Sequence, residues 1–439
     1  MKKTFLFMPS FFVLMAIANQ SCARSANDST STTKNDTTAK ASLVKPDADN
    51  AGLKLPQGFG ALKVTDGLGE ARHLAVTPQG DIYVKLSSLK NGKGIYFLHD
   101  ANGDGKIDTK TSFGSYTGTG MFIKNGYLYA SSDKEVFRYK LDANNKVTNP
   151  DKPEKIVTGL LSRGEHEAKA ITLDNDGNLY VNIGAYSNIC QQKDRVKGSP
   201  GMKPCPILDS AGGIWQFNAD KLNQTYGDDT HYATGLRNVV GLDWNTATNS
   251  LFVMQHGRDQ LQDYTDLFSQ KEAVELPAEC LYELHKGSNC GWPYIYYDPI
   301  QHKKILCPEY GGDGKKTGGE DAQDPVYAFP AHMAPNGLLF YTGNMFPEKY
   351  KNGAFIAFHG SWNRSPQPQK GYFVAFLPFK DGKPSGEWEI FADNFAGEEN
   401  VQPGTAKHRP CGLAQGPDGS LYVSDDSGGT IYRIIYTGK

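Results

Sequence analysis

The sequence lacks the patterns that mark several common protein classes. Its seven cysteines form no Cys-x-x-Cys pair, which argues against a cysteine-based metal cluster, and no Cys-x-x-Cys-His run, which excludes covalently attached c-type haem. No basic stripe occurs and the formal net charge is −2, so no nucleic-acid partner is expected. Helical signals are sparse, and the apolar run near the start, from Phe5 to Ala18, is too short to span a membrane.

The residues that the chain has in abundance indicate β-structure. Among 439 residues there are 48 glycines, 23 tyrosines and 22 phenylalanines, and 38% of all residues are hydrophobic. This composition is typical of many short strands joined by tight turns. The length fits one large all-β domain or two to three ordinary domains, so length alone leaves the domain count open.

The first fifty residues predict export. Two lysines, the apolar run and small or polar residues leading to Cys22 predict a signal peptide over residues 1–21. A cysteine at this position predicts a lipoprotein that is anchored through acylated Cys22, in the periplasm or at the outer membrane or cell surface. Plain secretion is the alternative, because Asn19 stands where such signals usually have an aliphatic residue. Residues 22–50, rich in Ser, Thr, Asn and Asp, predict a flexible tether, and residues 51–439 the folded domain.

The cysteine count agrees with an oxidising compartment. Six cysteines remain when Cys22 is set aside, an even number that allows three disulfides. Cys190 with Cys205 would close a polar insertion, Cys290 with Cys307 would brace the segment between them, and Cys280 with Cys411 is the pair left over.

One local pattern recurs six times along the chain. It consists of an apolar pair, a turn rich in Pro, Asn, Asp and Gly, and an aromatic-containing strand, as in "HLAVTPQGDIYV". Repeats of this kind with several strands each predict a six-bladed β-propeller of four-stranded antiparallel sheets. A pair of β-sandwiches is the alternative fold, but it does not explain the repeated module. The six repeats begin at His73, Met121, Ala170, Val239, Met333 and Gly412.

Five segments beside predicted strands carry an unusual set of charges and amides. In a propeller, the loops at one end of the central channel converge, so residues far apart in sequence can meet around one ligand. With "CGWPYIYYD" and "MAPNGLLFY", these segments resemble the glucose/sorbosone dehydrogenase family, six-bladed propellers that use pyrroloquinoline quinone (PQQ). "GSWNRSP" and "HRPCGLAQGPDGSLYVSDD" are more similar to its sorbosone dehydrogenase-like branch. The five segments are "GEHEAKA" (164–170), "TGLRNVVGL" (234–242), "MQHGRDQL" (254–261), "HGSWNRSP" (359–366) and "KHRPCGLA" (407–414).

The resemblance implies a role for each matching residue. His166 matches the family's general base. Arg237 and Asn238 match a PQQ-binding pair and Arg409 another PQQ-binding arginine, which suits a cofactor with three carboxylates. Gly257 and Arg258 match two residues whose backbone carbonyls hold Ca²⁺, although this match is looser because Arg258 is not a proline.

The chain also departs from the family pattern. Where the soluble glucose enzymes place a lysine on PQQ, the candidates here are His359, Asn363 and Arg364. Cys411 stands where those enzymes have a second arginine. No counterpart of their first-blade amide is found, and Arg72 is the candidate for its place.

The implied activity is the PQQ-dependent oxidation of a sugar, such as an aldose, a sorbosone-like aldehyde or a pyranose. His166 would take the hydroxyl proton while hydride passes to the quinone, polarised by Ca²⁺ and Arg237. Because the sequence carries no haem or flavin motif, electrons would go to an external acceptor. Two alternatives stay open: a surface propeller that binds carbohydrate or protein without turnover, and a lactonase-type metal-dependent hydrolase.

A second ion site is suggested by "DANGDGKID", residues 100–108. Asp100, Asn102, Asp104 and Asp108 are spaced like the first part of a Ca²⁺ loop, but the terminal glutamate of an EF-hand is absent. A polar hairpin turn is the alternative interpretation.

Overall fold

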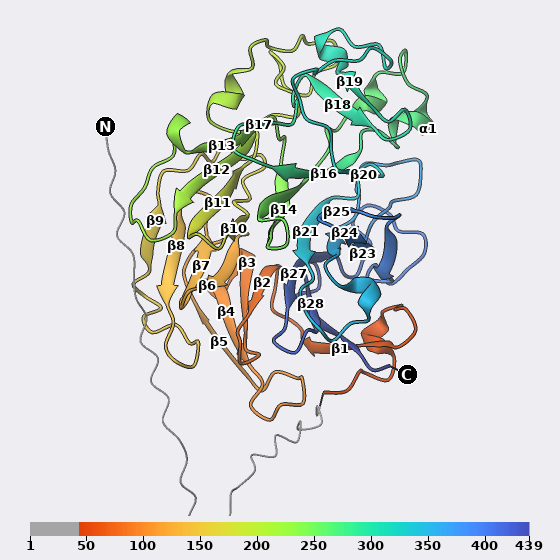
Figure 1. The fold of residues 1–439 in the computed structure, drawn as a ribbon. Helices are drawn as coiled ribbons and strands as arrows, with labels where there is room; N and C mark the ends of the chain where they lie inside the picture. The colour runs from red at the N-terminus through yellow and green to blue at the C-terminus, as the bar shows by residue number, and fades with distance from the viewer. Residues whose placement is uncertain (1–43, 439) are drawn as a thin grey trace, which may run out of the picture. The chain divides into compact units, whose positions relative to one another are not determined.

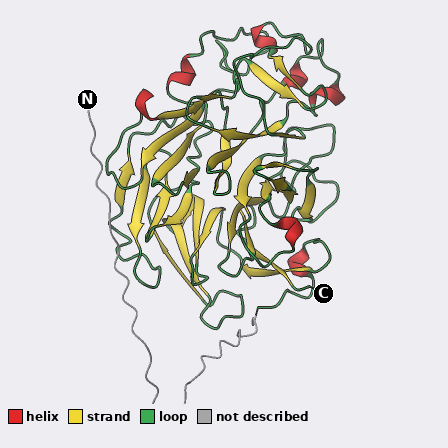
Figure 2. Ribbon diagram, in the orientation of Figure 1, coloured by secondary structure: helices red, strands yellow, loops and turns green. Residues whose placement is uncertain are grey.

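Strands make up nearly all the regular structure of residues 44–438, the part of the chain that the computed structural model describes (Figures 1 and 2). The predicted signal peptide, Cys22 and residues 22–43 of the predicted tether lie outside the described residues. Residues 44–50, at the end of that tether, contact the first strand. There Asp47 accepts hydrogen bonds from the backbone of Lys63 and from Lys106, and the Asp47 amide donates to Ala61.

Five four-stranded antiparallel sheets follow one another along the chain, each with its strands in sequence order. The first holds β2 (Ala71–Val76), β3 (Ile82–Lys90), β4 (Lys93–His99) and β5 (Thr109–Phe113), and the second β6 (Met121–Lys124), β7 (Tyr127–Ser131), β8 (Val136–Lys140) and β9 (Glu154–Val157). The third holds β10 (Ile171–Leu173), β11 (Asn178–Ile183), β12 (Gly213–Asn218) and β13 (His231–Thr234), extended by β17 (Ser288–Asn289). The fourth holds β14 (Val239–Asn245), β15 (Ser250–Gln255), β16 (Glu279–Leu284) and β20 (Tyr327–Phe329), and the fifth β21 (Pro335–Phe340), β22 (Ala354–Phe358), β23 (Phe373–Leu377) and β26 (Glu389–Ala392).

The sixth sheet joins the two ends of the described chain. Its strands β27 (Pro410–Gln415), β28 (Leu421–Asp425) and β29 (Ile431–Tyr436) are completed by β1 (Phe59–Thr65), which pairs antiparallel with β29. The innermost strands β2, β6, β10, β14, β21 and β27 each lie against the next, and β27 returns to β2. The structure therefore confirms the predicted six-bladed β-propeller.

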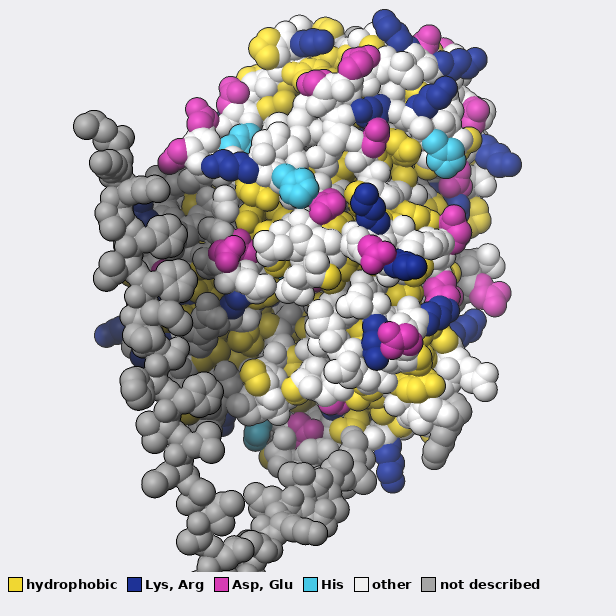
Figure 3. Space-filling view, viewed as in Figure 1, with side chains coloured by type: hydrophobic (Ala, Val, Ile, Leu, Met, Phe, Trp, Pro, Cys, Tyr) yellow, Lys and Arg dark blue, Asp and Glu magenta, His cyan; other side chains and the backbone are white. Residues whose placement is uncertain are grey.

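The strands are apolar on both faces because each sheet is covered by its two neighbours. All five residues of β22 and of β23 are buried. Radial stacking buries these faces and leaves only the short inner and outer edges of the sheets. On the face shown in Figure 3, acidic and basic side chains are interspersed, in agreement with the small net charge.

The inserted segments pack together beyond the third and fourth sheets. Figure 1 shows the hairpin β18 (Ile295–Asp298) and β19 (Lys303–Leu306) close to α1 (Gln270–Ala273), and their apolar residues share one core with Cys190 and Cys205. A small hairpin, β24 (Phe379–Lys380) and β25 (Lys383–Pro384), lies in the connection between β23 and β26 of the fifth sheet. No helix in residues 44–438 is long and apolar enough to cross a membrane. The 3₁₀ helices are η1 (Asn50–Gly52), η2 (Pro206–Asp209), η3 (Asp228–Thr230), η4 (Leu261–Asp263), η5 (Pro308–Tyr310) and η6 (Glu348–Tyr350).

Only one of the three predicted disulfides is present in the described residues. Cys190 and Cys205 are bonded, whereas the pairings of Cys290 with Cys307 and of Cys280 with Cys411 are wrong. Cys290 packs with Cys280 in the core around the fourth sheet, Cys307 packs in the core of the inserted segments, and Cys411 lies on β27. Neither of these two predicted pairs shares a core, so the even count of cysteines did not mean that all six are paired.

Candidate active site

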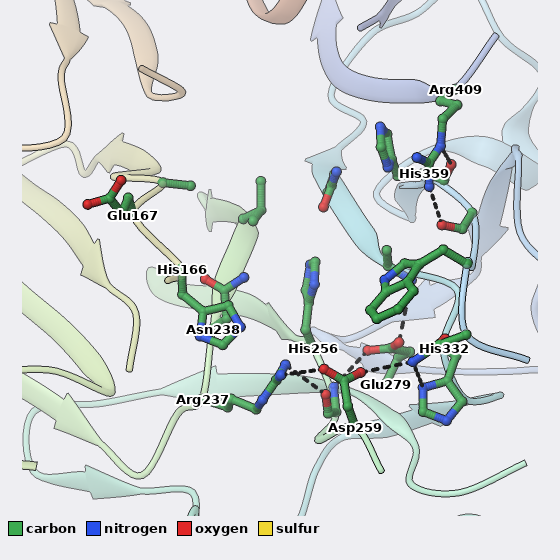
Figure 4. Close-up of a pocket in the computed structure, with 18 of the residues that line it drawn as sticks. His166, Glu167, Arg237, Asn238, His256, Asp259, Glu279, His332, His359 and Arg409 are labelled. Carbon is green, nitrogen blue, oxygen red and sulfur yellow. Dashed lines mark hydrogen bonds and ion pairs between the residues drawn. The ribbon is translucent and has the colours of Figure 1, made fainter. Parts of the chain in front are cut away.

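A cavity of about 470 Å³ opens where the loops before the innermost strands meet the loops after β15 and β22. This volume lies in the range of small-molecule sites, roughly 300–1,000 Å³. Figure 4 shows His166 and Asn238 on one side of the cavity and His359 with Arg409 on the other. Of the residues predicted from sequence, those lining it are Arg72, His166, Arg237, Asn238, Gly257, His359, Asn363 and Arg409.

The imidazole of His166 is held in one tautomer by the backbone. Its Nδ1 lies 2.5 Å from the carbonyl oxygen of Ala185. Because a carbonyl can only accept, Nδ1 carries the hydrogen and Nε2 of the neutral ring keeps a lone pair. The turn depends on Gly184, where a Cβ atom would lie 2.6 Å from that of His166. Burial, reinforced by the charge of Arg237, lowers the pKa of His166 to about 3, so the ring is neutral at neutral pH.

The glutamates that flank His166 are occupied elsewhere. Glu165 forms an ion pair with Arg195, and its Oε1 lies 4.0 Å from His166 Nε2. Glu167 accepts hydrogen bonds from the Ser162 hydroxyl and the Gly164 amide. The ring is therefore oriented by a backbone carbonyl and not by either neighbouring acid.

Arg237 and Asn238 enter the cavity from the segment before β14. Arg237 donates from NH1 to the Gly257 carbonyl at 3.0 Å and from NH2 to Asp259 Oδ2 at 2.8 Å. The Nε atom of Arg237 and the Oδ1 atom of Asn238 are buried and have no partner. Such orphaned polar atoms are costly unless a ligand or water pairs with them.

The opposite wall is built from three blades. Arg72 is the second residue of β2, His359 directly follows β22, and Arg409 directly precedes β27. Arg409 donates from Nε to the carbonyl of His359 at 3.0 Å and from NH2 to that of Gly360 at 2.6 Å. Within residues 44–438 its guanidinium has no carboxylate partner, so its charge is uncompensated. Arg72 and His359 both contact Asp426, which is described below.

Two predicted arginine side chains do not reach the cavity. Arg364 is 1% exposed and bonds Glu275, 2.5 Å away, together with the carbonyls of Val274 and Ala331. Arg258 forms a two-fold bond to Glu309, at 2.6 and 2.9 Å. Each guanidinium is thus paired with a carboxylate far away in the sequence, and the structure does not bring Arg364 to the other candidate cofactor residues.

The loop of residues 100–108 lies in the β4–β5 connection and does not line the cavity. Its side-chain oxygens accept hydrogen bonds from the loop's own backbone amides: Asp100 from Gly103 and Gly105, Asn102 from Asp104, Asp104 from Lys106, and Asp108 from Ala101 and Asn102. No group of three or more His, Cys, Asp or Glu side chains suited to a metal ion occurs within the described part of the chain. The contacts are those of a polar turn.

Comparison with known proteins places the chain in a family. The model of the TrAA12-like family matches residues 53–296 and 308–437. The chain belongs to the TrAA12-like family. Together with the relatives described next, this match confirms the resemblance to PQQ-dependent sugar dehydrogenases that the motifs indicated.

Relatives of this TrAA12-like protein include a "pyrroloquinoline quinone-dependent pyranose dehydrogenase" of Coprinopsis cinerea, 30% identical over 434 residues. The match covers 87% of this chain and 54% of the relative, so the chain spans about half the length of that protein. A solved holo form of a pyranose dehydrogenase PQQ domain from Coprinopsis cinerea is 21% identical with a TM-score of 0.67, covering 87% of this chain and 97% of that chain. A calcium structure of a Trichoderma reesei family AA12 enzyme is 20% identical with a TM-score of 0.69, covering 88% and 97%.

Several cavity residues of this TrAA12-like protein were missed from the sequence. Asp259 bridges Arg237, Arg195 and Asn363; burial raises its pKa, but the surrounding positive groups lower it further. Glu279 accepts the amides of Gly257 and Ala334, and burial raises its pKa to about 7. Asp259 lies inside "MQHGRDQL", a segment that the sequence analysis had already selected. Glu279 is the first residue of the largely apolar strand β16, and an acid at that position was the signal that could have identified it. The other missed lining residues include Arg195, His256, His332, Asn336 and Trp362.

Proposed function

We propose that this TrAA12-like protein is a PQQ-dependent sugar dehydrogenase. The observation that carries the proposal is the joint position of a neutral histidine with a free Nε2 and four arginines around one cavity. Family membership and the PQQ-dependent Coprinopsis cinerea relative support it. The arginines are Arg72, Arg195, Arg237 and Arg409.

The cavity residues fit a planar tricarboxylate. Arg409 supplies an uncompensated charge, and Arg237 offers its orphaned Nε atom. The orphaned Oδ1 atoms of Asn238 and Asn336 mark amides whose hydrogen bonds are incomplete without a ligand or water. Arginine pairs with carboxylates through two parallel hydrogen bonds, which supplies orientation as well as charge. Arg237, Asn238, Arg72, His359 and Arg409 would therefore hold PQQ.

The chemistry follows from the state of His166. PQQ, when bound, supplies a quinone carbon that accepts hydride. Nε2 of His166 would take the proton of the sugar hydroxyl as hydride leaves the carbon that bears this hydroxyl, so the alcohol becomes a carbonyl. The Nδ1–H bond to Ala185 prevents the ring from presenting its protonated nitrogen instead. General-base catalysis of this kind contributes about 10²–10⁴ in rate.

Calcium is the second cofactor of the proposal, held by the backbone of Gly257 and Arg258. Carbonyl oxygens suit this hard cation. The Gly257 carbonyl accepts one hydrogen bond from Arg237, and its second lone pair is the one that would face Ca²⁺.

The indole of Trp362 at the cavity wall supports a sugar as the substrate. Trp362 lines the cavity and is 62% exposed, although its neighbours Ser361 and Arg364 are buried and hydrogen-bonded. An exposed aromatic held on anchored backbone can stack on the apolar face of a pyranose ring. Electrons would then pass to an external acceptor.

Export also remains part of the proposal. The Cys190–Cys205 disulfide supports an oxidising compartment such as the periplasm or the cell surface. Anchoring through acylated Cys22 rests on the sequence pattern described above.

Reconstitution tests the function. Purified apoprotein is titrated with PQQ, with and without Ca²⁺, and reduction of a redox dye is followed over a panel of sugars and lactones. We expect dye reduction that requires both PQQ and a sugar. Lactone hydrolysis without PQQ would instead indicate the hydrolase, and sugar binding without turnover a binding propeller. Failure of PQQ to bind contradicts the proposal.

A further inference from the structure

A buried carboxylate connects two residues of the cavity wall from behind. Asp426 directly follows β28, is 10% exposed in its side chain, and does not itself line the cavity. Its Oδ2 accepts from Arg72 NH1 at 2.6 Å, and its Oδ1 accepts from His359 Nε2 at 2.6 Å. Arg72 belongs to the first sheet and His359 to the fifth, so one side chain of the sixth sheet joins three blades.

These contacts determine which nitrogen of His359 carries the hydrogen. Burial raises the pKa of Asp426, but His359 and Arg72 together lower it far below the usual range, so the carboxylate is ionised. An ionised carboxylate only accepts hydrogen bonds, which places the hydrogen of His359 on Nε2 and leaves Nδ1 unprotonated in the neutral ring. Burial outweighs the opposing effect of Asp426 and lowers the pKa of His359 below its ordinary value.

We propose that Asp426 is a positioning residue for the cofactor site: it holds Arg72 in place and fixes His359 as the Nε2–H tautomer. The inference rests on the proposed function, because Arg72 and His359 are there assigned to PQQ. Asp426 thereby preorganises two groups of different chemistry, a charged donor and an imidazole acceptor, before the cofactor arrives.

The PQQ affinity of Asp426→Asn separates positioning from charge. The substitution removes a negative charge beside Arg72, so charge alone would strengthen binding of a tricarboxylate. Loss of positioning predicts the opposite, and we expect the Kd for PQQ to rise by about tenfold or more. Asp418→Asn is the matched control: it breaks the 2.6 Å pair with Arg433 at the other end of the same sheet and should leave the Kd unchanged. Equal or tighter PQQ binding by Asp426→Asn overturns the proposal.

The tautomer of His359 gives a second readout that needs no cofactor. Arg72 always donates, so in Asp426→Asn the oxygen of the new side-chain amide must face Arg72 and its NH₂ group must face His359. His359 then accepts at Nε2, and its hydrogen moves to Nδ1. Imidazole ¹⁵N spectra of histidine-labelled apoprotein, assigned with His359→Gln, should show this change, whereas Asp418→Asn keeps the wild-type pattern. An unchanged tautomer in Asp426→Asn contradicts the inference.

The two readouts also separate this inference from the proposed function. If wild-type protein binds no PQQ, the proposed function fails, while the ¹⁵N spectra still decide whether Asp426 sets the tautomer. Thermal unfolding of each variant establishes that the fold is retained.

Discussion

At the scale of the residue, His166 shows how burial and one backbone bond keep an imidazole neutral with its lone pair on Nε2. We expect His166→Asn to lower kcat by about 10²–10⁴ while the Kd for PQQ changes little, because the variant loses the base and keeps the arginines. Steady-state dye reduction and a PQQ titration measure the two quantities. His302→Asn, at an exposed turn outside the cavity, is the control and should behave as wild type.

The pKa of His166 carries its own prediction. An ordinary histidine gains a proton near pH 6.5, whereas a ring whose pKa is about 3 stays neutral until far more acidic conditions. In ¹H–¹³C spectra of the apoprotein, the His166 resonances should therefore remain at their neutral positions as the pH falls from 8 to 5. A transition near pH 6.5 would mean that the ring is not buried beside Arg237 as the structure has it.

At the scale of the element, the segment closed by Cys190–Cys205 presents Arg195 to the cavity. Arg195 NH1 lies 3.3 Å from Asp259 Oδ2, and its NH2 pairs with Glu165, so the segment is tied to the same acid as Arg237. A disulfide that closes a loop of 15 residues stabilises by up to about 3 kcal/mol, chiefly by restricting the unfolded chain.

Reduction of this disulfide should lower the melting temperature and raise the KM for the sugar. The physical reason is that Arg195 loses its fixed position at the cavity, while the bonds of His166 to Ala185 and of Arg409 to His359 do not involve this segment. Thermal unfolding and kinetics with and without dithiothreitol provide the measurement. The double variant Cys190→Ser, Cys205→Ser should be insensitive to the reductant, whereas the buried free thiol variant Cys290→Ser should respond like wild type.

At the scale of the whole molecule, β1 closes the ring of sheets, and Phe59 is its main apolar anchor. The Phe59 ring lies 4.9 Å from that of Phe346, 5.2 Å from that of Tyr350 and 5.0 Å from that of Phe391. We expect Phe59→Ala to reduce the free energy of unfolding by about 3–5 kcal/mol. Denaturant titration measures it, with Leu222→Ala, at a 41% exposed position, as a control that should change stability by about 0.5 kcal/mol or less. A small effect of Phe59→Ala would show that the sixth sheet does not depend on β1.

The local signals of this chain were sufficient for the propeller and for part of the site. Alternating apolar residues and Asn, Asp and Gly turns act between neighbours in sequence, so six repeats predicted six sheets. The strand order then follows, and with it the end of the channel at which His166, Arg237 and Arg409 must meet. Local signals could not identify ion-pair partners that lie far apart in sequence. Glu309 lies 51 residues from Arg258, and Glu275 lies 89 residues from Arg364.

What the sequence by itself determined is therefore the repeat, the closure of a β-propeller and the motif residues that reach the cavity, because these depend on short-range periodicity and chain direction. Only the tertiary structure decided which arginines remain free for a ligand, which cysteines pair, and that Asp426 and Asp259 organise the two walls. Those outcomes depend on which side chains from different blades come within hydrogen-bonding distance, and that is a property of packing and not of any one segment.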